Sequence, residues 1–227
     1  MDVCDFHSHI LPGVDHGSYS VEESMAQLAL ARKSGVMRIV ATSHFYPHKE
    51  SVDKFIKRRD EAYMLLKERC GDDIPDIRLA AEVLLCAGFD EIPMLDDLCI
   101  RGTKTILIEL PFNDFGKEYV GSVRGLIERG YRVILAHAER YDLKHIEKMI
   151  EIGALLQVNV QSMTSAFTKK IFASWLERRK IVAIGSDIHG ADKRAYKKFK
   201  RACKRLGTYA EEIKRVSDSI WESSVPL

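Results

Sequence analysis

The sequence predicts a single α/β domain, residues 1–227, closed as a distorted seven-stranded (β/α)7 TIM-like barrel. Two observations predict this fold class. Seven short apolar runs alternate with amphipathic stretches, most of which end at a glycine, and this rhythm is typical of a parallel sheet covered by helices. Side chains that can bind a metal stand where those runs stop, and α/β barrels build their active sites at the carboxyl ends of the strands.

The seven apolar runs are expected to be strands that are buried on both faces. They cover residues 3–7, 37–41, 77–82, 105–110, 132–136, 155–159 and 181–185. The hydrophobic content of 46% is enough for one sizeable core. We therefore expect no second domain.

The helices are predicted from caps and from apolar spacing. The first begins at a capping box, Ser20 with Glu23, and its inward side chains are predicted to be Met25, Leu28 and Ala29. Further helices are expected over residues 52–69, 119–129, 143–152 and 193–206, with a glycine after each. The segment 83–102 interrupts the pattern and is expected to hold one short helix around Pro93.

Charge and cysteine content exclude several classes. The net charge is +2, whereas non-specific nucleic-acid binding usually needs a strongly basic chain. Five cysteines, at positions 4, 70, 86, 99 and 203, have no paired spacing and are expected to be free thiols in a reducing cytoplasm. We find no signal peptide and no apolar run long enough to span a membrane.

Nine potential metal ligands lie at the expected ends of strands: His7, His9, His16, His44, Glu82, Glu109, His137, Asp187 and His189. Alternate residues of a strand share a face, so His7 with His9, and Asp187 with His189, should point the same way. A lone histidine on an apolar strand is more often structural, and the argument therefore rests on the whole set. Mixed imidazole and carboxylate ligands suit Mn, Fe or Zn, and nine exceed the needs of one ion. The set predicts a polynuclear centre that hydrolyses a phosphate ester or an amide.

The same residues carry a family resemblance. The motifs that carry it are Asp5-Phe6-His7-Ser8-His9, Thr42-Ser43-His44, Ala81-Glu82, Ile108-Glu109-Leu110, His137-Ala138-Glu139-Arg140-Tyr141 and Ser186-Asp187-Ile188-His189. In this order they resemble the PHP (polymerase and histidinol phosphatase) metallohydrolases over essentially the whole chain. More closely, the chain resembles the bacterial metal-dependent protein-tyrosine phosphatases encoded with capsule and exopolysaccharide genes. The resemblance implies a PHP-type barrel with two or three Mn ions.

The resemblance also implies a distribution of ligands. His7, His9, Glu82 and Asp187 would hold one ion, and Glu82 would bridge to a second ion held by Glu109 and His137. A third ion would lie among His44, His189 and residue 16. The family usually has an acidic ligand at that last position, whereas here the run is Asp15-His16-Gly17. Three alternatives stay open: His16 binds the ion, Asp15 replaces it, or the third ion is absent.

The expected reaction is in-line attack of a metal-bridging hydroxide on phosphorus, with the ions offsetting the phosphoryl charge. A phenolate leaving group needs little help from a general acid, and phosphotyrosine is therefore a suitable substrate. Arg140 and Arg194 are candidates to bind the phosphoryl group, although either could be an ordinary surface arginine. By resemblance, the partner is the phosphotyrosine tail of a bacterial tyrosine kinase, and homo-oligomer formation is left open.

Two other classes remain as alternatives: a small-molecule phosphatase of the histidinol-phosphate type, and a catalytically silent regulatory module. A cysteine-based tyrosine phosphatase is excluded, because no cysteine is followed by an arginine six residues later. The stretch 193–205 contains eight basic residues among thirteen. It is expected to be a solvated helix face with Tyr196, Phe199 and Cys203 inward, and the alternative is a docking surface for an acidic phosphorylated tail.

Overall fold

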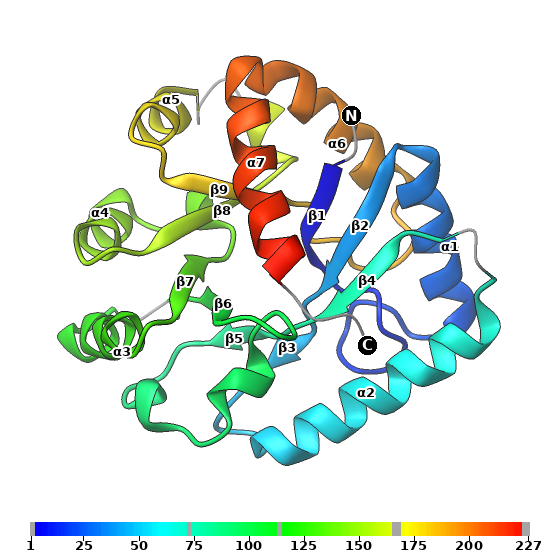
Figure 1. The fold of residues 1–227 in the computed structure, drawn as a ribbon, viewed down its shortest axis with the longest axis horizontal. Coiled ribbons are helices and arrows are strands. Elements are labelled where there is room, and N and C mark those ends of the chain that lie inside the picture. The colour runs from blue at the N-terminus through cyan, green and yellow to red at the C-terminus, as the bar shows by residue number, and fades with distance from the viewer. Residues whose placement is uncertain (1–2, 72–73, 113–114, 165–168, 224–227) are drawn as a thin grey trace.

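The computed structural model describes residues 3–71, 74–112, 115–164 and 169–223. Its strands pair in parallel and form two sheets (Figure 1). The three-stranded sheet has the order β1 (Val3–Ser8), β2 (Val36–Ala41) and β4 (Asp76–Leu79). The six-stranded sheet has the order β3 (His44–Phe45), β5 (Glu82–Leu84), β6 (Thr105–Glu109), β7 (Arg132–Leu135), β8 (Leu155–Asn159) and β9 (Ile181–Gly185).

The predicted α/β class with parallel strands is confirmed, but two of the predicted strands are interrupted. The residues between β2 and β3, and those between β4 and β5, are not in regular strand geometry. These two connecting segments still form backbone hydrogen bonds with each other. The amide of Ala80 donates to the carbonyl of Ala41 (2.9 Å), and that of Glu82 donates to Ser43 (3.1 Å). An isolated parallel bridge joins Ser8 to Ile188. The described strands therefore divide between two sheets, where the sequence predicted one seven-stranded barrel.

Helices cover the outer side of the strands, and one further helix crosses their amino-terminal ends (Figure 1). They are α1 (Val21–Lys33), α2 (Val52–Arg69), α3 (Lys117–Glu128), α4 (Leu143–Glu151), α5 (Lys169–Glu177), α6 (Lys193–Leu206) and α7 (Thr208–Ser223). Neither α5 nor α7 was predicted from the sequence pattern. Among the described residues, no helix is both long and apolar enough to cross a membrane.

Helix α1 presents a different face to the core from the predicted one. Leu28 is buried as expected, but Met25 is 39% exposed and Ala29 is also exposed. A polar side chain takes the inward position, since Gln27 is fully buried and its Nε2 donates to the carbonyl oxygen of Gly190 (2.8 Å). Hydropathy could not predict this, because Gln27 faces inward to hold the loop after β9 rather than to pack in the core.

The segment after β5 also differs from the prediction of one short helix. It contains two separate 3₁₀ turns, η1 (Phe89–Glu91) and η2 (Leu95–Leu98), and Pro93 lies between them. Proline has no N–H to donate and disfavours helical geometry at the preceding residue, so the turns cannot merge. Phe89 and Leu95 are buried and anchor the two turns in the core.

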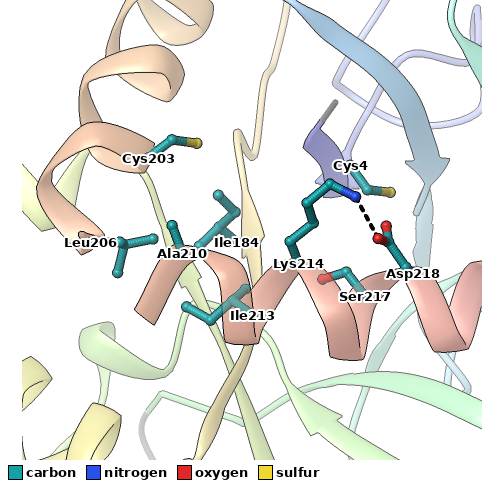
Figure 2. A pocket seen from close by; sticks show the side chains of 9 residues that line it. All are labelled: Cys4, Ile184, Cys203, Leu206, Ala210, Ile213, Lys214, Ser217 and Asp218. Atoms are coloured by element: carbon teal, nitrogen blue, oxygen red, sulfur yellow. Dashed lines mark hydrogen bonds and ion pairs between the residues drawn. The ribbon is translucent and has the colours of Figure 1, made fainter. Parts of the chain in front are cut away.

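At the amino-terminal ends of β1 and β9, α7 packs over the strands and leaves a small cavity between itself and α6 (Figure 2). Its volume is about 20 Å³, room for about one water molecule and too small for a substrate. Cys4 and Cys203 line it, and Lys214 pairs with Asp218 at its edge. All five cysteines are free thiols, as predicted.

Candidate metal centre

The predicted metal residues gather at the carboxyl ends of β1, β6, β7 and β9 and at the starts of β3 and β5, the short strands that follow β2 and β4. His7 lies in β1 and His9 just after it, His44 opens β3, Glu82 opens β5 and Glu109 ends β6, while His137, Asp187 and His189 follow β7 and β9. Each of these eight has a donor atom within 3.8 Å of a donor atom of another member. Residues as far apart in the sequence as His7 and His189 therefore form one cluster.

Glu82 is at the middle of this cluster. Its Oε2 lies 3.1 Å from Nε2 of His7, 3.2 Å from Nε2 of His9 and 3.0 Å from Nδ1 of His44. Its other oxygen, Oε1, lies 2.8 Å from Nε2 of His137. The two oxygens thus face different imidazoles, as a carboxylate that bridges two ions requires.

Asp187 forms a second junction. Its Oδ1 lies 3.6 Å from Nε2 of His7, 3.5 Å from Nε2 of His9 and 3.5 Å from Nδ1 of His189. Nε2 of His7 and Nε2 of His9 are 3.1 Å apart. Ligands that are each ~2.1 Å from one ion lie roughly 3.0–3.4 Å from one another. The spacing between the donors is therefore that of a coordination shell.

Orphaned polar atoms in the cluster support the same fit. Oε2 of Glu82, Nδ1 of His44 and Nε2 of His189 are buried without a hydrogen-bond partner. Three imidazole nitrogens lie within 3.2 Å of Oε2 of Glu82, yet none forms a hydrogen bond with it. Buried acceptors without donors are costly, and a cation at the point where they converge would satisfy them. The donor set therefore fits divalent metal ions.

Two carboxamides on β8, which were not predicted as site residues, hold the ligands in place. Oε1 of Gln157 accepts from Nδ1 of His7 (3.0 Å) and from the backbone N–H of His137 (2.7 Å). Nε2 of Gln157 donates to Oδ1 of Asn159 (2.9 Å), and Nδ2 of Asn159 donates to Oδ2 of Asp187 (2.9 Å). Because His7 donates from Nδ1, its Nε2 is free for a metal. Two amides at alternate positions of an apolar strand were the available signal.

Asp15 has a supporting role of the same kind. Its Oδ2 accepts from Nδ1 of His9 (2.8 Å) and from the backbone N–H of His44 (2.9 Å), and its Oδ1 accepts from the N–H of Gly17 (2.8 Å). These bonds orient His9 with Nε2 toward the cluster. Both carboxylate oxygens are thus engaged with the protein, and the geometry favours Asp15 as a positioning residue rather than a metal ligand.

His16 lies beside the cluster on an exposed loop. Its ring stacks at 4.9 Å from the ring of His44 and at 4.5 Å from that of His189. It is not part of the tightest donor groups among the described residues, which are His9–His44–His189, His7–His9–Glu82 and His44–Glu82–Glu109. His16 therefore adjoins the place predicted for a third ion without the close donor spacing of the other eight.

The backbone departs from the expected strand alternation at two ligands. His137 has φ 33° and Asp187 has φ 49°, both in the left-handed region that non-glycine residues rarely adopt. Asp187 therefore does not share a strand face with His189, as was predicted, and the left-handed turn brings the two together instead. Left-handed residues cluster at functional sites, where surrounding structure holds them.

Burial and neighbouring charges set the protonation of the cluster. Burial opposes a charge on His7, but the carboxylates of Glu82 and Asp187 outweigh it and raise the pKa of His7 to about 9. Burial likewise opposes ionisation of Glu82, yet the adjacent imidazoles lower its pKa well below the usual range. Burial, together with the charge of Glu82, raises the pKa of Glu109 to about 7. Burial lowers the pKa of His44 to about 3.

The two predicted arginines differ in what the structure describes. Nη2 of Arg140 lies 2.5 Å from Oδ2 of Asp187, and the Arg140 side chain is 44% exposed at the rim of the cluster. Arg194 is in the first turn of α6, and its side chain lies outside the described residues. Arg140 is thus placed to contact both a metal residue and a ligand that arrives from solvent.

A parallel α/β fold with a cluster of imidazoles and carboxylates at the strand ends defines a candidate metal-dependent enzyme. Residues 3–215 match the family model for capsular polysaccharide synthesis, CpsB/CapC. The chain belongs to this family. The capsule-type resemblance stated from the motifs is thereby confirmed.

Named relatives agree with this membership. The chain is 28% identical over 214 residues to tyrosine-protein phosphatase CpsB of Streptococcus pneumoniae, covering 84% of each. It is 29% identical over 209 residues to tyrosine-protein phosphatase YwqE of Bacillus subtilis, covering 85% of this chain and 79% of that protein. It also matches a crystal structure from work on YwqE and CpsB, described as unique metal-dependent tyrosine phosphatases, with TM-score 0.80, 19% identity and coverage of 99% and 96%. This last likeness concerns the fold.

Proposed function

We propose that this chain is a metal-dependent protein-tyrosine phosphatase that acts on a phosphotyrosine protein in capsule or exopolysaccharide synthesis. The observation that carries the proposal is Glu82, whose two oxygens face four imidazoles, from β1, β3 and the ends of β1 and β7, at 2.8–3.2 Å. Bound divalent ions would supply an activated water and offset the charge of the phosphoryl group. The names of the relatives support the substrate class.

The protein residues would hold and orient that centre. We assign His7, His9, Glu82 and Asp187 to one ion, and Glu109 with His137 to the second, which Glu82 also contacts. Gln157 and Asp15 fix the orientation of His7 and His9 by accepting hydrogen bonds from their Nδ1 atoms, which leaves each Nε2 facing the cluster. A third ion would lie near His44 and His189, with His16 completing it. We propose Mn as the native metal; Fe or Zn also suits these donors.

Arg140 is proposed to bind the phosphoryl group. Its guanidinium is bonded to Asp187 on one side and open to solvent on the other, so it can hold a phosphate oxygen without losing the carboxylate. Arg194 is proposed for the same task, on the basis of its position at the start of α6, four residues after Gly190.

An aromatic wall favours an aryl substrate. The ring of Phe112 is 62% exposed and lies 5.3 Å from the ring of Tyr141, which lies 5.6 Å from that of His137. Tyr141 is fixed, since its hydroxyl accepts from the backbone N–H of Leu110 (3.1 Å). An exposed phenylalanine beside a polar centre can stack on the ring of a phosphotyrosine. Histidinol phosphate and phosphoserine offer no comparable ring next to the phosphate.

Several finer points belong to the same proposal. We propose that β2 with β3, and β4 with β5, act as two interrupted strands, which gives seven strand positions closed by the Ser8–Ile188 bridge. The chain would act as one domain in the cytoplasm, with the tail of a tyrosine kinase as its substrate. The parallel sheets support the strand assignment, free cysteines suit a reducing cytoplasm, and the names of the relatives support a phosphotyrosine protein as substrate. Subunit association is left as a prediction to be measured.

The test is a substrate panel with protein purified without chelator and supplied with Mn. Phosphotyrosine peptides should be hydrolysed far faster than phosphoserine peptides or histidinol phosphate, a chelator should stop the reaction, and thiol alkylation should not. Phe112→Ala should raise KM for phosphotyrosine peptides and leave phosphoserine unchanged. Equal rates on histidinol phosphate and phosphotyrosine would favour the small-molecule phosphatase. Absence of metal-dependent hydrolysis on every substrate would favour the silent module.

A further inference from the structure

We propose that a groove between α1 and α6 binds an acidic, extended segment of the phosphotyrosine protein, away from the phosphotyrosine itself. The proposal rests on the proposed function and extends it to the choice of substrate protein. We name this surface the basic groove; it is lined mainly by Leu30, Lys33, Lys197, Lys200, Arg201 and Lys204. The catalytic cluster contributes none of these residues.

The shape of the basic groove suits a peptide. Its volume is about 560 Å³, and it opens to solvent. Leu30 is half-buried in its wall, and Tyr196 is buried beneath it. The cations are exposed around Leu30 and Tyr196. An extended chain could therefore lay its backbone against these two side chains and the aliphatic stems of the lysines, with its acidic side chains against the ammonium groups.

The cations of the basic groove have no ion-pair partner among the residues that the structure describes. Lys197, Lys200, Arg201 and Lys204 follow the i, i+3, i+4, i+7 spacing, so they share one face of α6. Within the described part of the chain, no carboxylate forms an ion pair with any of them or with Lys33, although cations elsewhere, such as those of Arg38, Arg58 and Arg178, are paired. Like charges at this spacing repel and destabilise a helix. A partner with the opposite charge would relieve that repulsion.

The basic groove is a local feature, and this favours a specific acidic peptide. The net charge of the whole chain is only +2, so the surface is not basic everywhere. Membrane-surface helices insert exposed apolar side chains, and no exposed large apolar residue of the described chain lies in the groove. Single-stranded nucleic acid is bound by stacking on exposed aromatic rings, and Tyr196 is buried. The exposed cations of the groove therefore suit the carboxylates of an acidic peptide better than a membrane surface or a nucleic acid.

The position of the two helices connects the groove with the metal cluster. Helix α6 begins four residues after His189, and α1 begins five residues after His16. Both helices therefore start beside the cluster and run away from it. The cations from Lys197 to Lys204 extend over about 10 Å of helix, which about three residues of an extended peptide would match. A substrate whose phosphotyrosine is at the metal centre could continue into the basic groove.

The test uses the full chain with Mn, a neutral phosphotyrosine peptide, and the same peptide extended by a run of glutamates on either side. The glutamates are added either before or after the phosphotyrosine, which gives two extended peptides. For the wild type, one of the two should have a KM at least about fivefold lower than that of the neutral peptide, at similar kcat. K200E/K204E should abolish this advantage and leave the neutral peptide unchanged. The matched control K54E/K148E reverses two exposed lysines on α2 and α4 and should keep the advantage.

The outcomes separate this proposal from the proposed function. The groove proposal would be refuted if the wild type had equal KM values for neutral and extended peptides. It would also be refuted if K200E/K204E and K54E/K148E lost the KM advantage of the extended peptide to the same extent. Binding of the unphosphorylated acidic peptide, followed by fluorescence anisotropy, reports on the groove even if no substrate is hydrolysed. Binding of phosphatidylserine vesicles or single-stranded RNA that K200E/K204E removes, with no peptide preference, would assign the groove to another class of partner and refute the peptide.

Discussion

Replacement of Gln157 tests whether the carboxamide of β8 positions the metal ligands. Its Oε1 accepts two hydrogen bonds, from Nδ1 of His7 and from the N–H of His137, at 3.0 and 2.7 Å. In Gln157→Leu both buried donors lose their acceptor, and each such loss costs about 1–3 kcal/mol. We expect the free energy of unfolding to fall by about 2–4 kcal/mol, because some relaxation is possible.

The same variant should lose metal affinity, because His7 is no longer held with Nε2 toward the cluster. Loss of such a supporting hydrogen bond typically weakens metal binding by about 10–100-fold. Calorimetric titration with Mn measures the affinity, and aryl phosphate turnover at saturating Mn measures what remains. Gln157→Glu keeps the acceptor for Nδ1 of His7 but loses the donor to Asn159, so it should recover part of the Mn affinity that Gln157→Leu loses. If Gln157→Leu binds Mn as tightly as the wild type, Gln157 does not position the ligands and the argument fails.

Four further predictions concern the cluster itself. Glu82→Gln should remove more bound metal than His44→Ala and abolish aryl phosphate hydrolysis, because Glu82 is placed between two ions; elemental analysis and rates at matched Mn would contradict this if the two variants behaved alike. His16→Asp should raise Mn-supported turnover, because a hard cation prefers carboxylate, and an unchanged Mn dependence would remove His16 from the ligand set. Arg140→Ala should cost about 2 kcal/mol in kcat/KM, the scale of a charge-assisted hydrogen bond, and an unchanged kcat/KM would exclude a phosphoryl contact. The pKa of His7 is raised to about 9, so protonated His7 stabilises the metal-free folded protein by about 3 kcal/mol below pH 6.5, and this contribution is lost as the pH rises to 9. Thermal unfolding should therefore show that the metal-free protein becomes less stable from pH 6.5 to 9 and that added Mn restores its stability. A stability of the metal-free protein that rises with pH over this window would contradict the assignment.

The sequence was a sufficient guide where local pattern decides structure. Each of the seven apolar runs forms strand, and Tyr196, Phe199 and Cys203 of α6 are buried as predicted. Apolar side chains at helical or strand spacing have few other places to go. Eight of the nine predicted metal residues also have donor atoms in one cluster, because parallel strands bring their carboxyl ends together.

Other features could not be predicted because tertiary contacts decide them. Helix α7 begins directly after Gly207, whose φ of 54° allows a sharp turn, and the predicted end of α6 gave no indication of a second helix. Gln27 is buried because it bonds to the loop after β9. Gln157 and Asp15 act through contacts with residues far along the chain or on another strand. The interruptions of the strands near His44 and Glu82 likewise depend on bonds between neighbouring strands.

The strained backbone and the buried charges of the cluster lead to one physical conclusion. The left-handed conformations of His137 and Asp187 each cost about 1–3 kcal/mol, and the orphaned atoms of Glu82 and His44 add an unfavourable desolvation. These costs concentrate at the end of the sheets where the metal cluster lies. Cations bound there would satisfy the same atoms and return that free energy as stability. Metal binding and folding of this end should therefore be thermodynamically coupled, and the rest of the core should be largely independent of the metal.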